Sequence, residues 1–222
     1  MAELIHEIGQ MPDKFGYRCC RLERQGFLSI YSFGLHDREH RHDLMHRRDA
    51  VVVLPVDFDQ RVLYMVEQPR FIRAFVETAQ GSEALQQTNN GQETDFEIPI
   101  ETVLTPELPA GVIDANESPR QTAVRELKEE TGITVSESAL EEVATYYPSV
   151  GGTTERLTGF IAKLDDQTEF APPEGDGFEL IRVWKMSWDE AFDMLRNGEI
   201  KTASSHLLLR ELMIRELQQA NG

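Results

Sequence analysis

The chain has 222 residues with 39 acidic and 22 basic side chains, which gives a formal net charge of −17. A surface with this charge repels nucleic-acid phosphates, which argues against a dedicated nucleic-acid-binding protein. No apolar window approaches the ~20 residues needed to cross a bilayer, and residues 1–20 lack the apolar run of a secretory signal. We therefore expect a globular protein of the cytoplasm, without membrane or nucleic-acid partners, in which Cys19 and Cys20 are free thiols.

The first part of the chain combines strand-like and polar segments. Two strands are predicted around Tyr17–Glu23 and Phe27–Phe33, joined by a tight turn. Residues 36–48 (HDREHRHDLMHRR) then predict a solvated, polar connection. A metal site built from the histidines of this segment is the alternative, but no cysteine or distant ligand pair completes a tetrahedral set. We expect residues 1–47 to form a small N-terminal β annex.

A buried hairpin and a long polar stretch are predicted next. The runs Ala50–Val56 (AVVVLPV) and Val62–Val66 (VLYMV) are almost wholly apolar, which indicates two paired strands at the centre of a sheet. Residues 77–95 are polar and show no apolar period. They predict a mobile loop inserted into a larger domain that spans residues 48–222.

The segment from Ser118 to Gly132 carries the signals of a helix. Ser118 is the expected N-cap with Gln121 completing a capping box, Pro119 occupies the first helical position, and Gly132 is the C-terminal stop. The apolar residues that would dock this helix on the sheet share one face: Ala123, Val124 and Leu127.

Three strands and two helices are expected besides. The strands are predicted at Glu142–Tyr147, Leu157–Leu164 and Glu179–Met186. One helix begins after Ser187, with Glu190 completing its capping box, and stops at Gly198. The last helix, about Ser204–Gln219, has an apolar face that comprises Leu207, Leu208, Leu212, Ile214 and Leu217.

The helix after Ser118 also carries the chemistry. Glu126, Glu129 and Glu130 lie on one helix face, because positions i, i+3 and i+4 are neighbours. Carboxylates placed so close repel one another unless cations lie between them, and oxygen-only ligation suits Mg²⁺ or Mn²⁺. Gly111 allows a tight turn ahead of the helix, and the Ala110 carbonyl could reach the same cations. A solvated helix with surface ion pairs is the alternative.

The spacing of these residues resembles the Nudix box, Gly-x5-Glu-x7-Arg-Glu-U-x-Glu-Glu-x-Gly-U, in which U is aliphatic. Its fixed positions are filled by Gly111, Glu117, Arg125, Glu126, Leu127, Glu129, Glu130, Gly132 and Ile133. The resemblance implies the Nudix fold, an α/β (α+β) architecture with a mixed sheet sandwiched between helices. It also implies that Glu126, Glu129 and Glu130 bind cations, that Arg125 orients a carboxylate, and that Glu117 holds the motif together.

Segments outside the box resemble the ADP-ribose pyrophosphatase branch of this family: VVVLPVDFDQRVLYMVEQPR, ELPAG and PSVGGTTER. The branch implies Mg²⁺- or Mn²⁺-dependent hydrolysis of ADP-ribose or a related ADP-sugar to AMP and a sugar phosphate. It also implies a homodimer formed through the N-terminal strands. A hydrolase of a GDP- or UDP-hexose and a non-catalytic nucleotide-sugar sensor are the alternatives. The complete set of box carboxylates argues against the sensor.

The same branch implies functional residues outside the box. Its general base lies in a loop, for which Glu179 is favoured over Glu174. Arg70, in EQPR, matches an arginine near the substrate phosphates, and Glu155 and Arg156 are further candidates for substrate binding. Solvated loop acids and surface ion pairs are the alternative interpretations of these side chains.

Overall fold

The structure is a computed structural model that describes residues 17–24, 28–35, 41–89, 95–174 and 180–220. The chain divides into two compact units, one of residues 1–48 with 149–155 and one of residues 49–148 with 156–222. The division after Arg48 lies one residue beyond the expected boundary of the annex. None of the helices in the described ranges is long and apolar enough to cross a membrane.

The first unit contains an antiparallel sheet in the order β1-β2-β3. Its strands are β1 (Tyr17–Arg24), β2 (Ser29–Leu35) and β3 (Arg41–His46). The two predicted strands are confirmed, whereas the turn at 25–27 lies outside the described residues. The prediction of a polar connection was wrong for residues 41–46. These residues form a strand because β2 supplies hydrogen-bonding partners from Ser29 to Gly34.

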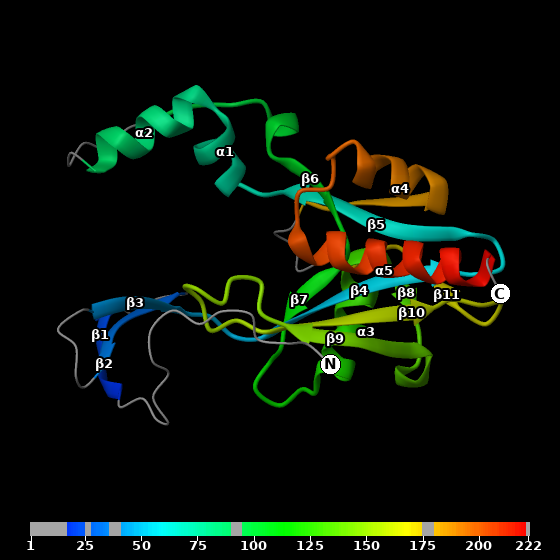
Figure 1. The fold of residues 1–222 in the computed structure, drawn as a ribbon. Coiled ribbons are helices and arrows are strands. Elements are labelled where there is room, and N and C mark those ends of the chain that lie inside the picture. Colours follow the sequence, from blue (N-terminus) through cyan, green and yellow to red (C-terminus); the bar gives the residue numbers. More distant parts are fainter. Residues whose placement is uncertain (1–16, 25–27, 36–40, 90–94, 175–179, 221–222) are drawn as a thin grey trace, which may run out of the picture. The chain divides into compact units, whose positions relative to one another are not determined.

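The second unit is built on a seven-stranded mixed sheet (Figure 1). Its main strand order is β12-β5-β4-β10-β9, with β6 paired to β5 and β7 paired to β4. The β4–β10 pair is parallel and the other pairs of this sheet are antiparallel. The strands are β4 (Ala50–Asp57), β5 (Val62–Pro69), β6 (Leu104–Glu107), β7 (Ala110–Val112), β9 (Leu140–Tyr146), β10 (Leu157–Lys163) and β12 (Arg182–Ser187).

Helices cover both faces of this sheet (Figure 1). Helix α3 (Pro119–Thr131) packs against Val51 and Val53 of β4, while α4 (Trp188–Arg196) and α5 (Ala203–Ala220) pack against Val52, Leu54 and Val56. Strand β4 is therefore buried on both faces, which explains why its sequence is continuously apolar rather than alternating. The predicted central hairpin and the sandwich of a mixed sheet between helices are confirmed.

Short elements complete the second unit. Two-residue strands β8 (Ile133–Thr134) and β11 (Glu169–Phe170) pair with each other, and two 3₁₀ turns lie at Ile100–Thr102 and Glu137–Ala139. The capping boxes predicted for α3 and α4 are both present.

The apolar face predicted for α5 is only partly correct. Leu208 and Leu212 are fully buried, as expected, and Leu209 joins them. Ile214 and Leu217 are instead 49% and 57% exposed. At 100° per residue, Ile214 lies about 200° from Leu212 and so points away from the sheet.

The prediction of a mobile loop at residues 77–95 was wrong for most of that segment. The chain forms α1 (Ile72–Glu77) and α2 (Ala79–Asn89), while residues 90–94 lie outside the described ranges. The Thr78 hydroxyl accepts a hydrogen bond from Gly81 N at 3.0 Å and so caps α2, whose Ala, Gln, Glu and Leu residues favour a helix. A Cβ at Gly81 would lie 1.9 Å from the Ala74 carbonyl oxygen, so glycine permits the close packing of the two helices.

Candidate active site

Helix α3 brings its acidic side chains against the backbone of β7. Ala110 N donates a hydrogen bond to Glu130 Oε2 at 3.0 Å. A Cβ at Gly111 would lie 1.8 Å from the carboxyl carbon of Glu126, so only glycine leaves room for that carboxylate. The helix is held in place by its buried residues Ala123 and Leu127 and ends at Gly132, which has a φ of 73°. Two of the predicted cation ligands therefore lie beside the Ala110–Gly111 backbone.

Arg125 connects three carboxylates. Its Nε lies 2.9 Å from Glu117 Oε1, and its Nη1 lies 2.7 Å from Glu126 Oε1 and 2.9 Å from Glu129 Oε2. The Arg125 hydrogen bonds, with one from the Thr122 hydroxyl at 2.8 Å, lower the pKa of Glu117 to about 2. The hydrogen bond with Glu117 is also the largest cause of the raised pKa of Arg125. Glu117 thus ties the loop before the helix to the middle of the helix.

Glu130 is buried between α3, β5 and β7. Only 3% of its surface is exposed, and its Oε1 lies 3.4 Å from the Gln68 amide nitrogen. Gln68 belongs to β5 and is itself buried. Among the three acids of the helix face, Glu130 is the least exposed.

Arg70 follows β5 and pairs with a buried carboxylate. Its Nε lies 2.7 Å from Oε1 of Glu107, a β6 residue that is only 4% exposed. Burial raises the pKa of Glu107, while hydrogen bonds and charge from Arg70 and a hydrogen bond from Gln68 oppose the rise. Gln68 and Glu107 were not predicted as site residues from the sequence. For Gln68 the signal was a polar side chain at a buried position of the largely apolar β5, whereas β6 (LTPE) offered no such contrast for Glu107.

The remaining predicted residues lie in several places. Glu174 is exposed and pairs with Lys128 Nζ of α3 at 2.9 Å, which raises the pKa of Lys128. Glu179 lies outside the described residues. Arg156 Nε binds Asp49 Oδ2 at 3.0 Å in the second unit. Glu155 belongs to the first unit, where it lies 3.5 Å from Arg47.

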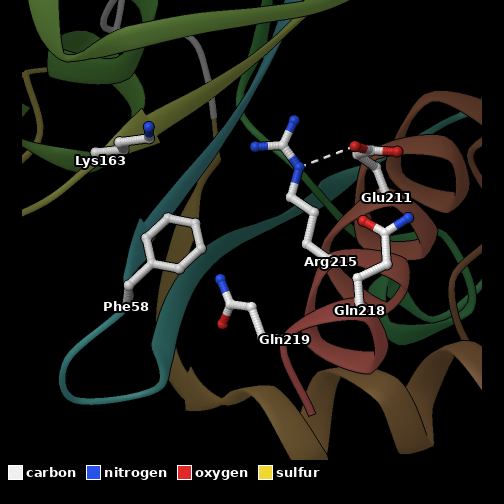
Figure 2. Close-up of a pocket in the computed structure, with 6 residues that line it drawn as sticks. All are labelled: Phe58, Lys163, Glu211, Arg215, Gln218 and Gln219. Carbon is white, nitrogen blue, oxygen red and sulfur yellow. Dashed lines mark hydrogen bonds and ion pairs between the residues drawn. The ribbon is translucent and has the colours of Figure 1, made fainter. Parts of the chain in front are cut away.

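A hollow of about 830 Å³ lies near the other ends of β4 and β10, away from the β4–β7 pairing (Figure 2). Its lining residues are Phe58, Lys163, Glu211, Arg215, Gln218 and Gln219. Arg215 bonds Glu211 at 2.8 Å, and both Arg215 and Lys163 pair with Glu141. None of the predicted site residues lines this hollow.

Comparison with known families identifies the family to which the chain belongs. A match to the NUDIX domain covers residues 45–204. The chain belongs to the Nudix family. A solved structure described as an ADP compounds hydrolase matches with a TM-score of 0.66 at 16% identity, covering 96% of this chain and 99% of that one. This likeness confirms the Nudix fold.

Two curated relatives are nucleotide-sugar pyrophosphatases. A GDP-mannose pyrophosphatase of Cronobacter sakazakii is 39% identical over 106 residues, which are 48% of this chain and 54% of the relative. An ADP-ribose pyrophosphatase of Bacillus subtilis is 30% identical over 129 residues, which are 56% of this chain and 65% of the relative. The matches therefore span about half to two thirds of these relatives.

The acids of the Nudix helix suit a hard divalent cation by chemistry, since they supply oxygen ligands only. Within the described ranges, however, no three acidic, histidine or cysteine side chains converge as a ready-made cation site. Arg125 explains this arrangement, because it draws Glu126 and Glu129 toward its guanidinium. Each of these two carboxylates gives one oxygen to Arg125, namely Glu126 Oε1 and Glu129 Oε2.

Proposed function

We propose that this Nudix protein hydrolyses the diphosphate bond of ADP-ribose or a related ADP-sugar, giving AMP and a sugar phosphate. The observation that carries the proposal is the placement of Glu126 and Glu130 against the Ala110–Gly111 backbone, with Glu129 held nearby through Arg125. The similarity to an ADP-ribose pyrophosphatase supports the choice of substrate.

In this proposal Glu126, Glu129, Glu130 and the Ala110 carbonyl hold Mg²⁺ or Mn²⁺. When bound, such a cation neutralises diphosphate charge and lowers the pKa of water. Arg125 orients Glu126 and Glu129 through its Nη1, while its Nε is bonded to Glu117 at 2.9 Å. Arg70, with 43% of its side chain exposed, presents its guanidinium to the substrate phosphates.

The proton of the attacking water requires an acceptor, for which we propose Glu179. Glu174 is the alternative, but its carboxylate is held in an ion pair with Lys128 and would have to leave that partner to accept the proton. Arg156 and Glu155 remain proposed substrate contacts. Arg156 is paired with Asp49 and Glu155 with Arg47, so each would have to exchange that partner for substrate.

A second candidate substrate is a GDP-hexose, which the similarity to a GDP-mannose pyrophosphatase favours. The test is a panel of ADP-ribose, ADP-glucose, GDP-mannose and UDP-glucose, each with Mg²⁺ and with Mn²⁺, with released nucleoside monophosphate measured by chromatography. The highest kcat/KM is expected with ADP-ribose or ADP-glucose. A preference for GDP-mannose would replace the proposed substrate, and tight binding without turnover would indicate a sensor.

We further propose a homodimer in the cytoplasm, formed through the annex. Strand β1 is an edge of the described three-stranded sheet, and an edge strand offers unpaired backbone groups to a second copy. Light scattering after gel filtration tests the dimer, and deletion of residues 1–47 should abolish it. Fractionation of cells tests the compartment.

A further inference from the structure

Three buried polar side chains connect Arg70 to the acidic helix. Val66, Gln68 and Arg70 alternate onto one face of the β5 segment, and the pairing of Val66 with Glu107 places Glu107 on that same face. Gln68, Glu107 and Glu130 are 8%, 4% and 3% exposed. The strand register therefore places Gln68 and Glu107 on the face of β5 and β6 that meets Glu130 of α3.

The contacts among these side chains form a continuous path. Arg70 Nε bonds Glu107 Oε1 at 2.7 Å, and the Gln68 amide nitrogen lies 3.4 Å from Glu130 Oε1. Gln68 also lowers the pKa of Glu107, and the strand register places the two side chains on one face. One amide nitrogen carries two hydrogens, so it can donate to both carboxylates at once. Glu130 is fixed on its other side by Ala110 N at 3.0 Å.

We propose that Glu107 is a positioning residue, which holds the Arg70 guanidinium directly and the Glu130 carboxylate through Gln68. This inference rests on the proposed function, in which Arg70 faces the substrate phosphates and Glu130 binds the cation. Glu107 thereby sets the separation between the phosphate-binding group and the cation-binding group. A buried carboxylate bonded to Arg70 suits this role, because burial and hydrogen bonding restrict its movement.

The geometry predicts a distinct effect for each member of the path. Loss of the Glu107 charge releases Arg70, which is half exposed, and also removes an acceptor that orients Gln68. Loss of the Gln68 amide disturbs the Glu130 side only. Residues that orient a metal ligand affect metal affinity by about 10–100-fold, and small displacements of a phosphate-binding group reduce kcat/KM by a comparable factor.

The experiment uses the full chain and compares Glu107→Gln, Gln68→Met and the matched control Glu67→Gln. Glu67 also pairs with an arginine, Arg182, at 3.0 Å, but it alternates onto the opposite face of β5. Mn²⁺ affinity is measured by electron paramagnetic resonance, and kcat and KM are measured with the best nucleotide sugar of the panel. Thermal melting checks that each variant is folded.

Glu107→Gln is expected to weaken Mn²⁺ binding and to raise KM, each about tenfold or more. Gln68→Met should weaken Mn²⁺ binding with little change in KM, and Glu67→Gln should change neither. In a double-mutant cycle, Glu107→Gln should raise KM less in an Arg70→Ala background than in the wild type. A residue that served stability alone would lower the melting temperature without this coupling.

Unchanged Mn²⁺ affinity in Glu107→Gln would overturn the inference, as would additive effects on KM. If Glu107→Gln does not fold, Gln68→Met tests the connection to Glu130 through Gln68. Reduced Mn²⁺ affinity in Gln68→Met supports that connection, and unchanged affinity overturns it. If the wild type hydrolyses none of the nucleotide sugars, the proposed function fails, but the Mn²⁺ titrations still decide whether Glu107 positions Glu130.

Discussion

Arg125 occupies the place of a counter-ion among the acids of the Nudix helix. It bonds Glu117, Glu126 and Glu129 at 2.7–2.9 Å, so these carboxylates are partly neutralised without a cation. Glu130 accepts a hydrogen bond from Ala110 N at 3.0 Å and lies 3.4 Å from the Gln68 amide nitrogen. Glu130 is thus held by a backbone donor of β7 and an amide of β5.

Substitution of Glu130 by glutamine should remove most activity and leave the fold intact. An amide oxygen is a weaker, neutral ligand, and loss of such an electrostatic contribution reduces kcat by about 10²–10³-fold. Steady-state kinetics at saturating Mg²⁺ measures this effect, with Glu101→Gln at an exposed position as the control. Turnover near that of the wild type would contradict the assignment of Glu130 as a cation ligand.

Substitution of the proposed general base should act on turnover rather than on binding. Glu179→Gln is expected to lower kcat by ~10²–10⁴-fold with little change in KM, as for a lost general base. Glu174→Gln should cost less than about tenfold, because Glu174 is paired with Lys128. The reverse pattern would transfer the role to Glu174, and two mild effects would exclude both side chains.

Glu117 should make the stability of the protein depend on pH. Arg125 lowers its pKa from 4.5 to about 2 in the folded chain. Because the folded pKa is depressed, the stabilisation is fully present above pH 4.5 and is lost as the pH falls toward 2. Urea unfolding of wild type and Glu117→Gln should therefore give a difference in free energy that is constant from pH 7 to 6. The difference should shrink between pH 4.5 and 3, and a constant difference there would contradict the pairing.

At the scale of elements, the sequence predicted those helices and strands whose stabilising contacts come from neighbouring residues. Helix α3 was predicted between its caps because Ser118, Gln121 and Gly132 act on neighbouring residues. Strand β3 was missed because its partner β2 supplies the backbone hydrogen bonds, which no property of residues 41–46 reports. Helix α2 was missed because its sequence carries no apolar stripe; it is capped by Thr78 and lies close to α1 at Gly81.

The residues of the candidate site also divide into those that local sequence predicts and those that it does not. The acids of α3 were predicted from their spacing along one helix, a purely local property. Gln68 and Glu107 lie on different strands, and only the register that opposes Val66 to Glu107 brings them together. A single sequence contains no measure of that register, so their connection to Glu130 required the structure.

Glycine at position 81 should be required for the packing of α1 on α2. Replacement of a helical glycine by alanine stabilises a protein by about 1 kcal/mol where the site is exposed, whereas Gly81 is buried. Here the new Cβ would lie 1.9 Å from the Ala74 carbonyl oxygen and 2.7 Å from Phe75 Cα, so the sign should reverse. Hydrogen exchange of residues 72–89 should become faster in Gly81→Ala and stay unchanged in the control Gln86→Ala. Slower exchange in Gly81→Ala would contradict the close contact.

At the scale of the whole molecule, divalent cations should stabilise the fold. Binding to the folded chain alone raises the free energy of unfolding by mass action, by about 2.7 kcal/mol at a cation concentration 100 times the Kd. Mg²⁺ and Mn²⁺ should therefore raise the Tm of the wild type more than that of Glu130→Gln. NaCl at matched ionic strength controls for screening of the net charge of −17.

Calcium should separate binding from turnover. Ca²⁺ also prefers oxygen ligands and should raise the Tm, but its looser coordination geometry positions the attacking water less well. Hydrolysis rates measured with each cation at saturation should therefore be much lower with Ca²⁺ than with Mg²⁺. Equal rates would count against the proposed role of the cation.

The parallel pairing of β4 with β10 has a consequence for how the chain folds. The register joins Ala50 to Leu157, more than 100 positions later in the sequence. Closing so long a loop is entropically costly before its contacts form, so this pairing should be a slow step. Until β10 arrives, β4 exposes an unpaired edge together with an apolar sequence that the native fold buries completely. The interval between synthesis of β4 and docking of β10 is therefore the period of greatest aggregation hazard.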